Sequence, residues 1–237
     1  MNGRSSCDGD EISTECSSNR CSIVSPTRNF RGRSYGEWSA EWWQFVYSTP
    51  LQDNIAFDES GENSSKNQSS PVWFLAGTFG GNAERNVTIP AGMAILIPIL
   101  NCCYNRAEDG EDLTELELRI KARKDIDKVI ELEAVIDGES IGNLEDFRVE
   151  SPIFNFKVPD ANPIEKLKGH EGQDSQGISD GYWILLESIT IGVHTIHFRG
   201  IIPPNFELDV NYKISVRPLL NDTSSSSNIS AKKRSSK

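Results

Sequence analysis

Two stretches of the chain have the spacing of an amphipathic helix. In the first, Ser34 and Glu37 form a capping-box pair, and apolar side chains then recur every three or four residues. The stretch ends at Thr49, because the residue before Pro50 is pushed out of helical geometry. We therefore predict a helix over 34–49 with one strongly aromatic face. The apolar residues of this face are Tyr35, Trp38, Trp42, Phe45 and Val46.

The second helical stretch covers 112–127. It begins with Asp112 and Glu115, another capping-box-like pair. Its predicted apolar face consists of Leu113, Leu116 and Ile120. Between the two helical stretches, the polar region 51–70 is predicted to be a loop.

Most other apolar positions alternate with polar ones, which is the pattern of half-buried strands. The clearest case is 208–216, where every second residue is apolar. Within 147–158 the alternation changes phase at Ser151-Pro152, which predicts a bulge or a strand break there. The predicted strands cover 72–76, 86–90, 93–100, 130–136, 147–158, 182–187, 193–198 and 208–216.

About eight short strands separated by glycine and proline turns, with two helices, predict a mainly β fold. We expect a two-sheet β-sandwich, Ig-like or jelly-roll in type, with two accessory α-helices that cover a sheet edge or one end. No internal repeat and no linker interrupts 34–220. This region is therefore predicted to be a single domain.

The two ends of the chain differ from this domain in composition. Both are rich in serine, asparagine and charged residues, and they hold too few large apolar groups to offset the entropy lost on ordering. We predict a disordered N-terminal arm over 1–33 and a disordered, Ser-rich basic tail over 221–237. The arm and the tail have net charges of +1 and +3. Since the net charge of the whole chain is −11, the domain between them has a net charge of −15.

This acidic balance disfavours a nucleic-acid binder, because such proteins neutralise phosphates with clustered lysines and arginines. The longest apolar stretch is also far shorter than the roughly 18 residues of a spanning helix, so we expect no transmembrane segment. No apolar signal-peptide core is visible near the N-terminus. Taken literally this indicates the cytoplasm, whereas an extracellular or cell-surface location is favoured if a leader has been removed.

Five segments of the chain resemble motifs of a family of archaeal and bacterial proteins, which are often exported and to which no activity is assigned. The segments are GEWSAEWWQF, PVWFLAGTFGG, TIPAGMAILIPILN, SPIFNF and SDGYW, and they span most of 32–216. The resemblance implies a β-sandwich and brings no site residues with it. The stretch TIGVHTIHF at 190–198 also resembles a strand found late in prokaryotic Ig-like surface modules.

A third resemblance concerns metal chemistry. The word IPAG at 89–92, followed by an apolar strand, resembles the second motif of cupins, which are metal-binding jelly rolls. That family implies a histidine three residues after the glycine and a His-x-His pair in an earlier strand. This chain has Ile95 at the first position and no histidine before Pro90. We therefore predict no metal site and no cofactor.

The best candidate site lies on the first helix. Glu37 and Glu41 are one turn apart and close to Trp42 and Trp43, and carboxylates beside indole rings suit a sugar site. The alternative is that Glu37 only caps the helix and that the indoles pack in the core. With Asp180, these four residues form the predicted binding site, and we assign no catalytic residue.

Other reactive side chains have simpler interpretations. His194 and His197 face opposite sides of a strand and cannot jointly chelate a metal, and His170 lies in the polar stretch 169–179, a predicted loop. Adjacent Cys102 and Cys103 also point to opposite faces. The acids of 108–117 lack the order of a calcium loop, so a solvated helix start is favoured over a weak calcium site.

These observations predict a non-enzymatic β-sandwich module of the cell envelope or exterior that binds a protein or glycan partner. The alternative is an enzyme on a cupin-like or jelly-roll scaffold, either a carboxylate hydrolase or a metal-dependent enzyme. The sequence leaves the ligand undetermined.

Overall fold

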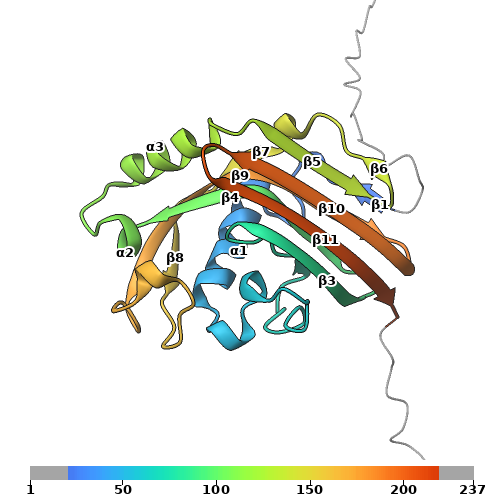
Figure 1. Cartoon of the computed structure of the whole chain (residues 1–237), viewed down its shortest axis with the longest axis horizontal. Helices are drawn as coiled ribbons and strands as arrows, with labels where there is room; N and C mark the ends of the chain where they lie inside the picture. The colour runs from blue at the N-terminus through green and yellow to red at the C-terminus, as the bar shows by residue number, and fades with distance from the viewer. Residues whose placement is uncertain (1–20, 219–237) are drawn as a thin grey trace, which may run out of the picture.

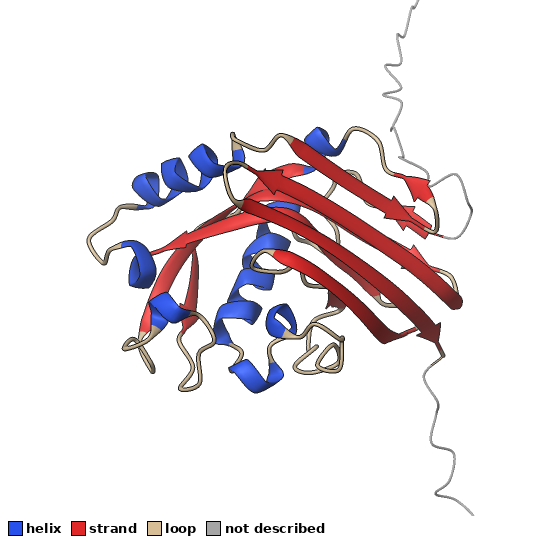
Figure 2. Cartoon of the chain, in the orientation of Figure 1, coloured by secondary structure: helices blue, strands red, loops and turns tan. Residues whose placement is uncertain are grey.

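A computed structural model of the protein describes residues 21–218 of the 237-residue chain. Two β-sheets of six and five strands pack together, with helices around one end and one face (Figure 1, Figure 2). The prediction of a mainly β, two-sheet sandwich with accessory helices is confirmed. The predicted tail over 221–237 and the first 20 residues of the predicted arm lie outside the described residues.

The elements have the following bounds. The helices are α1 (Tyr35–Ser48), α2 (Arg106–Asp109) and α3 (Glu115–Ile126), and the 3-10 turns are η1 (Leu51–Asp53), η2 (Ile55–Phe57), η3 (Leu144–Phe147) and η4 (Glu165–Leu167). The first sheet contains β1 (Cys21–Ile23), β2 (Val72–Phe74), β4 (Ala94–Asn105), β7 (Arg148–Glu150), β8 (Phe154–Lys157) and β9 (Asp174–Ile189). The second contains β3 (Gly81–Pro90), β5 (Glu131–Ile136), β6 (Glu139–Ser140), β10 (Gly192–Ile202) and β11 (Phe206–Arg217).

The first sheet is organised around β9, which has 16 residues and pairs with β1, β4, β7 and β8. The second sheet has the order β3-β11-β10-β5-β6. The pairs β2–β4 and β3–β11 are parallel, and the other pairs are antiparallel. The predicted break at Ser151-Pro152 is confirmed, since it separates β7 from β8.

The first helix forms as predicted. Ser34 caps α1 through a complete capping box with Glu37, and Thr49 follows its last turn. The helix packs against β7, β8 and β9 of the first sheet. A side chain at Gly36 would meet the Glu150 carbonyl at 2.3 Å, so only glycine allows this close approach of α1 to β7.

The prediction of disorder over 1–33 is wrong for 21–33. Strand β1 pairs with β9, and Ile23, Val24 and Phe30 are buried in the main core. The Tyr35 hydroxyl donates to the Val24 carbonyl over 2.6 Å, which fixes this segment to α1. The prediction used the average composition of the arm, which is polar. An average does not show that a few apolar residues are individually buried.

The second helix has a different buried face from the predicted one. Thr114 and Glu117 form its capping box, and Leu118 and Ala122 pack on the sheet beside Ile178. The predicted face residues Leu116 and Ile120 are exposed, at 63% and 52% of their surface. Both sets of residues have helical spacing, so the spacing alone could not choose between them.

The polar stretch that follows His170 also differs from the predicted loop. Residues 174–179 belong to β9, where they pair with β8 on one side and β4 on the other. The backbone ladder forms there although the side chains are polar, since neighbouring strands on both sides satisfy its hydrogen bonds.

Candidate functional site

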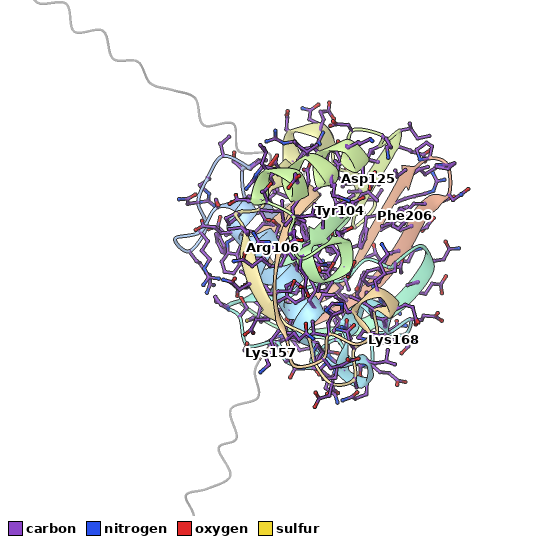
Figure 3. All side chains as sticks on the ribbon, turned by 90° about the vertical axis from the view of Figure 1, so that its left-hand side faces the viewer. Tyr104, Arg106, Asp125, Lys157, Lys168 and Phe206 are labelled. Atoms are coloured by element: carbon purple, nitrogen blue, oxygen red, sulfur yellow. The ribbon has the colours of Figure 1, made fainter. Side chains whose placement is uncertain are left out.

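A cavity of about 440 Å³ opens beside α1 at one end of the sandwich. Its walls come from α1, η2, the loop after β2, β4, α2, the segment around η4, and the start of β11. Phe206 of β11, labelled in Figure 3, belongs to this lining. The volume lies within the roughly 300–1,000 Å³ of small-molecule sites.

Aromatic rings form most of one wall and continue to the surface. Trp42 and Trp43 meet edge to face at 5.1 Å between ring centroids, and Tyr47 stacks on Trp43 at 5.1 Å. Phe79 contacts Trp43 at 6.5 Å and stacks on Phe57 at 4.7 Å. Phe57 and Phe79 are 36% and 49% exposed, so two aromatic rings stand at the mouth of the cavity.

A buried arginine holds the two segments that carry these mouth residues. The Arg85 guanidinium donates to the carbonyls of Asp58, Ala76 and Gly77, and also to the Tyr212 hydroxyl over 2.8 Å. The Tyr212 hydroxyl in turn donates to the Ala76 carbonyl over 2.9 Å. These bonds fix the chain just after η2 and just after β2, and they satisfy a buried charge without a carboxylate.

Glu108 supplies a carboxyl group to the lining. Its Oε1 is buried and has no hydrogen-bond partner within the described residues. Burial raises the pKa of Glu108, and the negative charge of Asp109 raises it further. Hydrogen bonds from the Asn105 and Tyr47 side chains and the positive charge of Lys166 act in the opposite direction. A carboxyl group with a buried, unpaired oxygen is costly to the fold unless something outside the chain binds it.

The two indoles of the wall differ in their hydrogen bonds. The Trp42 Nε1 donates to the Leu75 carbonyl over 2.6 Å. The Trp43 Nε1 is buried and has no partner within residues 21–218. The cavity thus offers a ligand one unpaired donor, on Trp43, and one unpaired carboxyl oxygen, on Glu108.

The two adjacent cysteines point to opposite faces of β4, as predicted. The Cys102 thiol lies 3.5 Å from the Ala122 carbonyl of α3, whereas Cys103 interacts with Tyr47 of α1. Burial raises the pKa of both thiols well above the ordinary range. Both are therefore protonated near neutral pH and are poor nucleophiles.

Of the five predicted site residues, the structure brings only Trp42 and Trp43 together in this cavity. Asp180 lies on the opposite face of the first sheet. Ser179, the residue before it, places its hydroxyl 3.3 Å from Ser39 of α1, and successive strand residues face opposite sides.

The two predicted carboxylates of α1 have partners at the surface. The Glu37 carboxylate accepts a hydrogen bond from the Ser34 backbone N–H over 2.8 Å and completes the capping box. This contact lowers its pKa. Glu41 forms an ion pair with Arg33. Neither residue lines the aromatic cavity.

Asp180 belongs instead to a charged cluster under α3. Arg148 donates to both oxygens of the Asp180 carboxylate, with its shortest contact at 2.6 Å, and to Asp127 at 2.7 Å. Glu150 in the same cluster binds Arg119 at 2.7 Å and also Arg123. Each carboxylate of this open polar cavity faces a guanidinium, so the cluster is balanced within the chain.

The histidines make separate contacts, on opposite faces of β10 as predicted. His194 is buried, with Nδ1 2.7 Å from Asp137 and Nε2 2.8 Å from the Thr190 carbonyl. His197 is half-buried and lies 3.1 Å from Asp209. Within 21–218, no three histidine, cysteine or acidic residues group closely enough to hold a metal ion.

Glu108 is the functional candidate that the sequence does not reveal. The acids of 108–117 predict a solvated helix start, and most of them are exposed, but Glu108 turns into the cavity. The helix that contains it, α2, has only four residues, and the Asn105 side chain accepts a hydrogen bond from the Glu108 N–H over 2.9 Å. Tyr47 could have been predicted from the sequence, since it follows Trp43 by one helical turn on the aromatic face.

Comparisons with known proteins add no functional assignment. A scan against protein-family models and a search among curated proteins return no match. The solution structure of amebosin is similar over 57% of this chain and 96% of its own, at 14% sequence identity and a TM-score of 0.20. A likeness at this level carries no argument about function or fold.

The part of the chain described by the structure has no helix that is both long and apolar enough to cross a membrane.

Proposed function

We propose that this protein is a binding module that takes a small, largely apolar organic molecule into the aromatic cavity. The observation that carries the proposal is the cavity itself, which has the volume of a small-molecule site and an aromatic wall that reaches the surface at Phe57 and Phe79. Exposed aromatic rings are costly in water, and a ligand that covers them removes this cost. The unpaired polar atoms of Trp43 and Glu108 supply orientation for such a ligand.

Binding is favoured over catalysis by the chemistry of the lining. The Cys103 thiol is protonated near neutral pH because burial raises its pKa, and no histidine belongs to the lining residues that could activate it. The lining holds two carboxyl groups, Glu108 and Glu165, but no thiolate or histidine to act with them, which favours holding a ligand over a covalent step. The enzyme interpretation of the sequence has no comparable support.

The type of partner follows from the same surface. The lining is mostly apolar, which favours a compact organic molecule over the extended glycan or protein partner expected from the sequence. The net charge of −11 supports the expectation that nucleic acid is not the partner. A location at the cell exterior, and an Ig-like or jelly-roll type of sandwich, are part of the proposal through the family resemblance alone.

A fluorescent probe tests this proposal directly. We expect neutral N-phenyl-1-naphthylamine to bind the full chain and to brighten as it leaves water. Phe79→Ala removes an aromatic ring of the mouth and is expected to weaken binding about 5-fold, since a ring contact contributes roughly 1 kcal/mol. Leu116→Ala is the matched control, because Leu116 is also an exposed apolar residue, lies on α3 and does not line the cavity.

Two results would overturn the proposal. The first is an absence of probe binding by the natural protein. The second is equal binding by the natural protein and Phe79→Ala, which would place the probe elsewhere on the surface.

A further inference from the structure

We propose that the ligand of this cavity carries an ammonium group, for which Glu108 is the counter-ion and the aromatic wall is the cage. This inference rests on the proposed function, because it names the chemistry of the molecule that the cavity takes.

One oxygen of Glu108 has no partner in the described chain, although hydrogen bonds from the Asn105 and Tyr47 side chains reach the carboxyl group. Its Oε1 is buried, and no ion pair among the described residues includes its carboxylate, whereas Asp109 beside it has the Lys121 ammonium at 4.0 Å. Buried carboxylates in folded proteins have partners. A cation from outside the chain is the partner that would complete this one.

The aromatic wall belongs to the same cavity as Glu108. The faces of aromatic rings attract cations, and tryptophan attracts them most strongly. Trp42, Trp43 and Tyr47 lie together with Glu108 in one lining. Tyr47 already stacks on Trp43 and on Phe156, so the indoles of Trp42 and Trp43 are the rings left to meet a cation. A carboxylate and indole rings around one cavity form an arrangement that recognises organic ammonium groups.

Charged groups of both signs surround Glu108. Asp109 acts on it from the same helix and Lys166 from η4, and the effect of Asp109 is the larger of the two. The neutral groups Tyr47 and Cys103 face it from α1 and β4. The charged residues of the lining are the two carboxyl groups of Glu108 and Glu165 and the one ammonium group of Lys166, and this excess of negative charge favours a cation over an anion.

The position of the proton makes the inference specific. Burial raises the pKa of Glu108 in the free protein, and a bound cation requires the ionised form. Affinity for an ammonium ligand should therefore increase as the pH rises through this pKa. A ligand that instead accepts a proton from neutral Glu108 would show the opposite dependence.

The test uses two probes of the same shape. Benzoylcholine carries a trimethylammonium group, and 3,3-dimethylbutyl benzoate replaces its nitrogen by carbon. Quenching of tryptophan fluorescence reports binding, since Trp42 and Trp43 line the cavity. At pH 7.5 we expect the full chain to prefer the cation by about 10-fold or more, on the scale of a desolvated cation–π contact.

Glu108→Gln keeps the shape of the side chain and removes its charge, and we expect it to lose this preference while it binds the neutral ester as before. Unchanged binding of the ester also shows that the variant is folded. The matched control is Glu111→Gln, which removes an exposed charge three residues away and outside this lining. The control should keep the full preference.

The outcomes separate the inference from the proposed function. Equal binding of both probes by the natural protein would overturn the ammonium inference and leave the proposed function standing. A preference that survives in Glu108→Gln would also overturn the inference, because another group would then be the counter-ion. Binding of neither probe, together with no binding of N-phenyl-1-naphthylamine, would overturn both.

Discussion

Two carboxyl groups, on opposite faces of the first sheet, show how differently the fold can treat the same chemical group. Asp180 is 1% exposed, and the Arg148 guanidinium binds both of its oxygens. Glu108 has a buried oxygen without a partner in the described chain. The carboxylate that is fully paired completes a structural cluster, and the one left open lines a cavity with an exposed aromatic mouth.

The sequence selected Asp180 and not Glu108 as a site residue because burial and pairing are tertiary properties. Asp180 was selected with the tryptophans of α1, and Glu108 was placed in a solvated acid cluster. The pairing of β4 and β9 places Asp180 across from Cys102, under α3, and away from α1.

The largest effect is expected where the paired carboxylate loses its partner. Arg148→Met leaves the Asp180 carboxylate buried without a cation, and we expect the free energy of unfolding to fall by about 3 kcal/mol. Urea denaturation measures this loss. Arg28→Met is the matched control, because Arg28 pairs with an exposed Glu187, and it should cost less than about 0.5 kcal/mol. Similar losses in the two variants would contradict the structural role of the Asp180 pair.

A smaller effect is expected from the two indoles. Trp42→Phe removes a hydrogen bond to the Leu75 carbonyl, whereas Trp43→Phe removes an N–H that has no partner in the described chain. The same atoms are lost in both variants, so Trp42→Phe should be less stable than Trp43→Phe by about 1 kcal/mol. Denaturation of both variants under one condition measures the difference. Equal stability would show that Trp43 is not held open for a ligand.

The smallest effect concerns the pH dependence of stability. The pKa of Glu108 is raised above its ordinary value of 4.5, so the folded protein holds this proton more tightly than the unfolded chain does. The contribution of Glu108 to stability therefore falls as the pH rises from the unfolded pKa through the folded one. Glu108→Gln has no such proton, and its stability relative to the natural protein should increase over this range, by less than about 1 kcal/mol.

Denaturation curves of Glu108→Gln and the natural protein between pH 4 and pH 8 measure this change, with Glu111→Gln as the control. A stability difference that decreases with pH would contradict the assigned direction of the pKa.

Much of the fold could be predicted from local patterns. The helix α1, its capping box and its end at Thr49 follow from residues within one or two turns of each other. The alternation over 208–216 identified β11, and the phase change at Ser151-Pro152 identified the break between β7 and β8. Each of these features depends on neighbouring residues, which a sequence displays directly.

The errors share a different cause. The buried face of α3, the pairing of β1 and the strand at the start of β9 are all decided by distant segments that pack or pair with them. The cavity is the extreme case, since its walls come from seven separate parts of the chain. Trp42 and Trp43 could be selected because they share a helix, but Glu108 joins them only through the tertiary fold.

The most direct test of the account is the titration of the Glu108 carboxyl carbon, observed by NMR in glutamate-labelled protein and assigned with Glu108→Gln. We predict a midpoint above the ordinary value of 4.5 in the free protein, and a decrease when benzoylcholine is added, because a cation stabilises the ionised form. An ordinary midpoint in the free protein, or a midpoint that saturating benzoylcholine leaves unchanged, would contradict the claim that this carboxyl group is held open for an ammonium ligand.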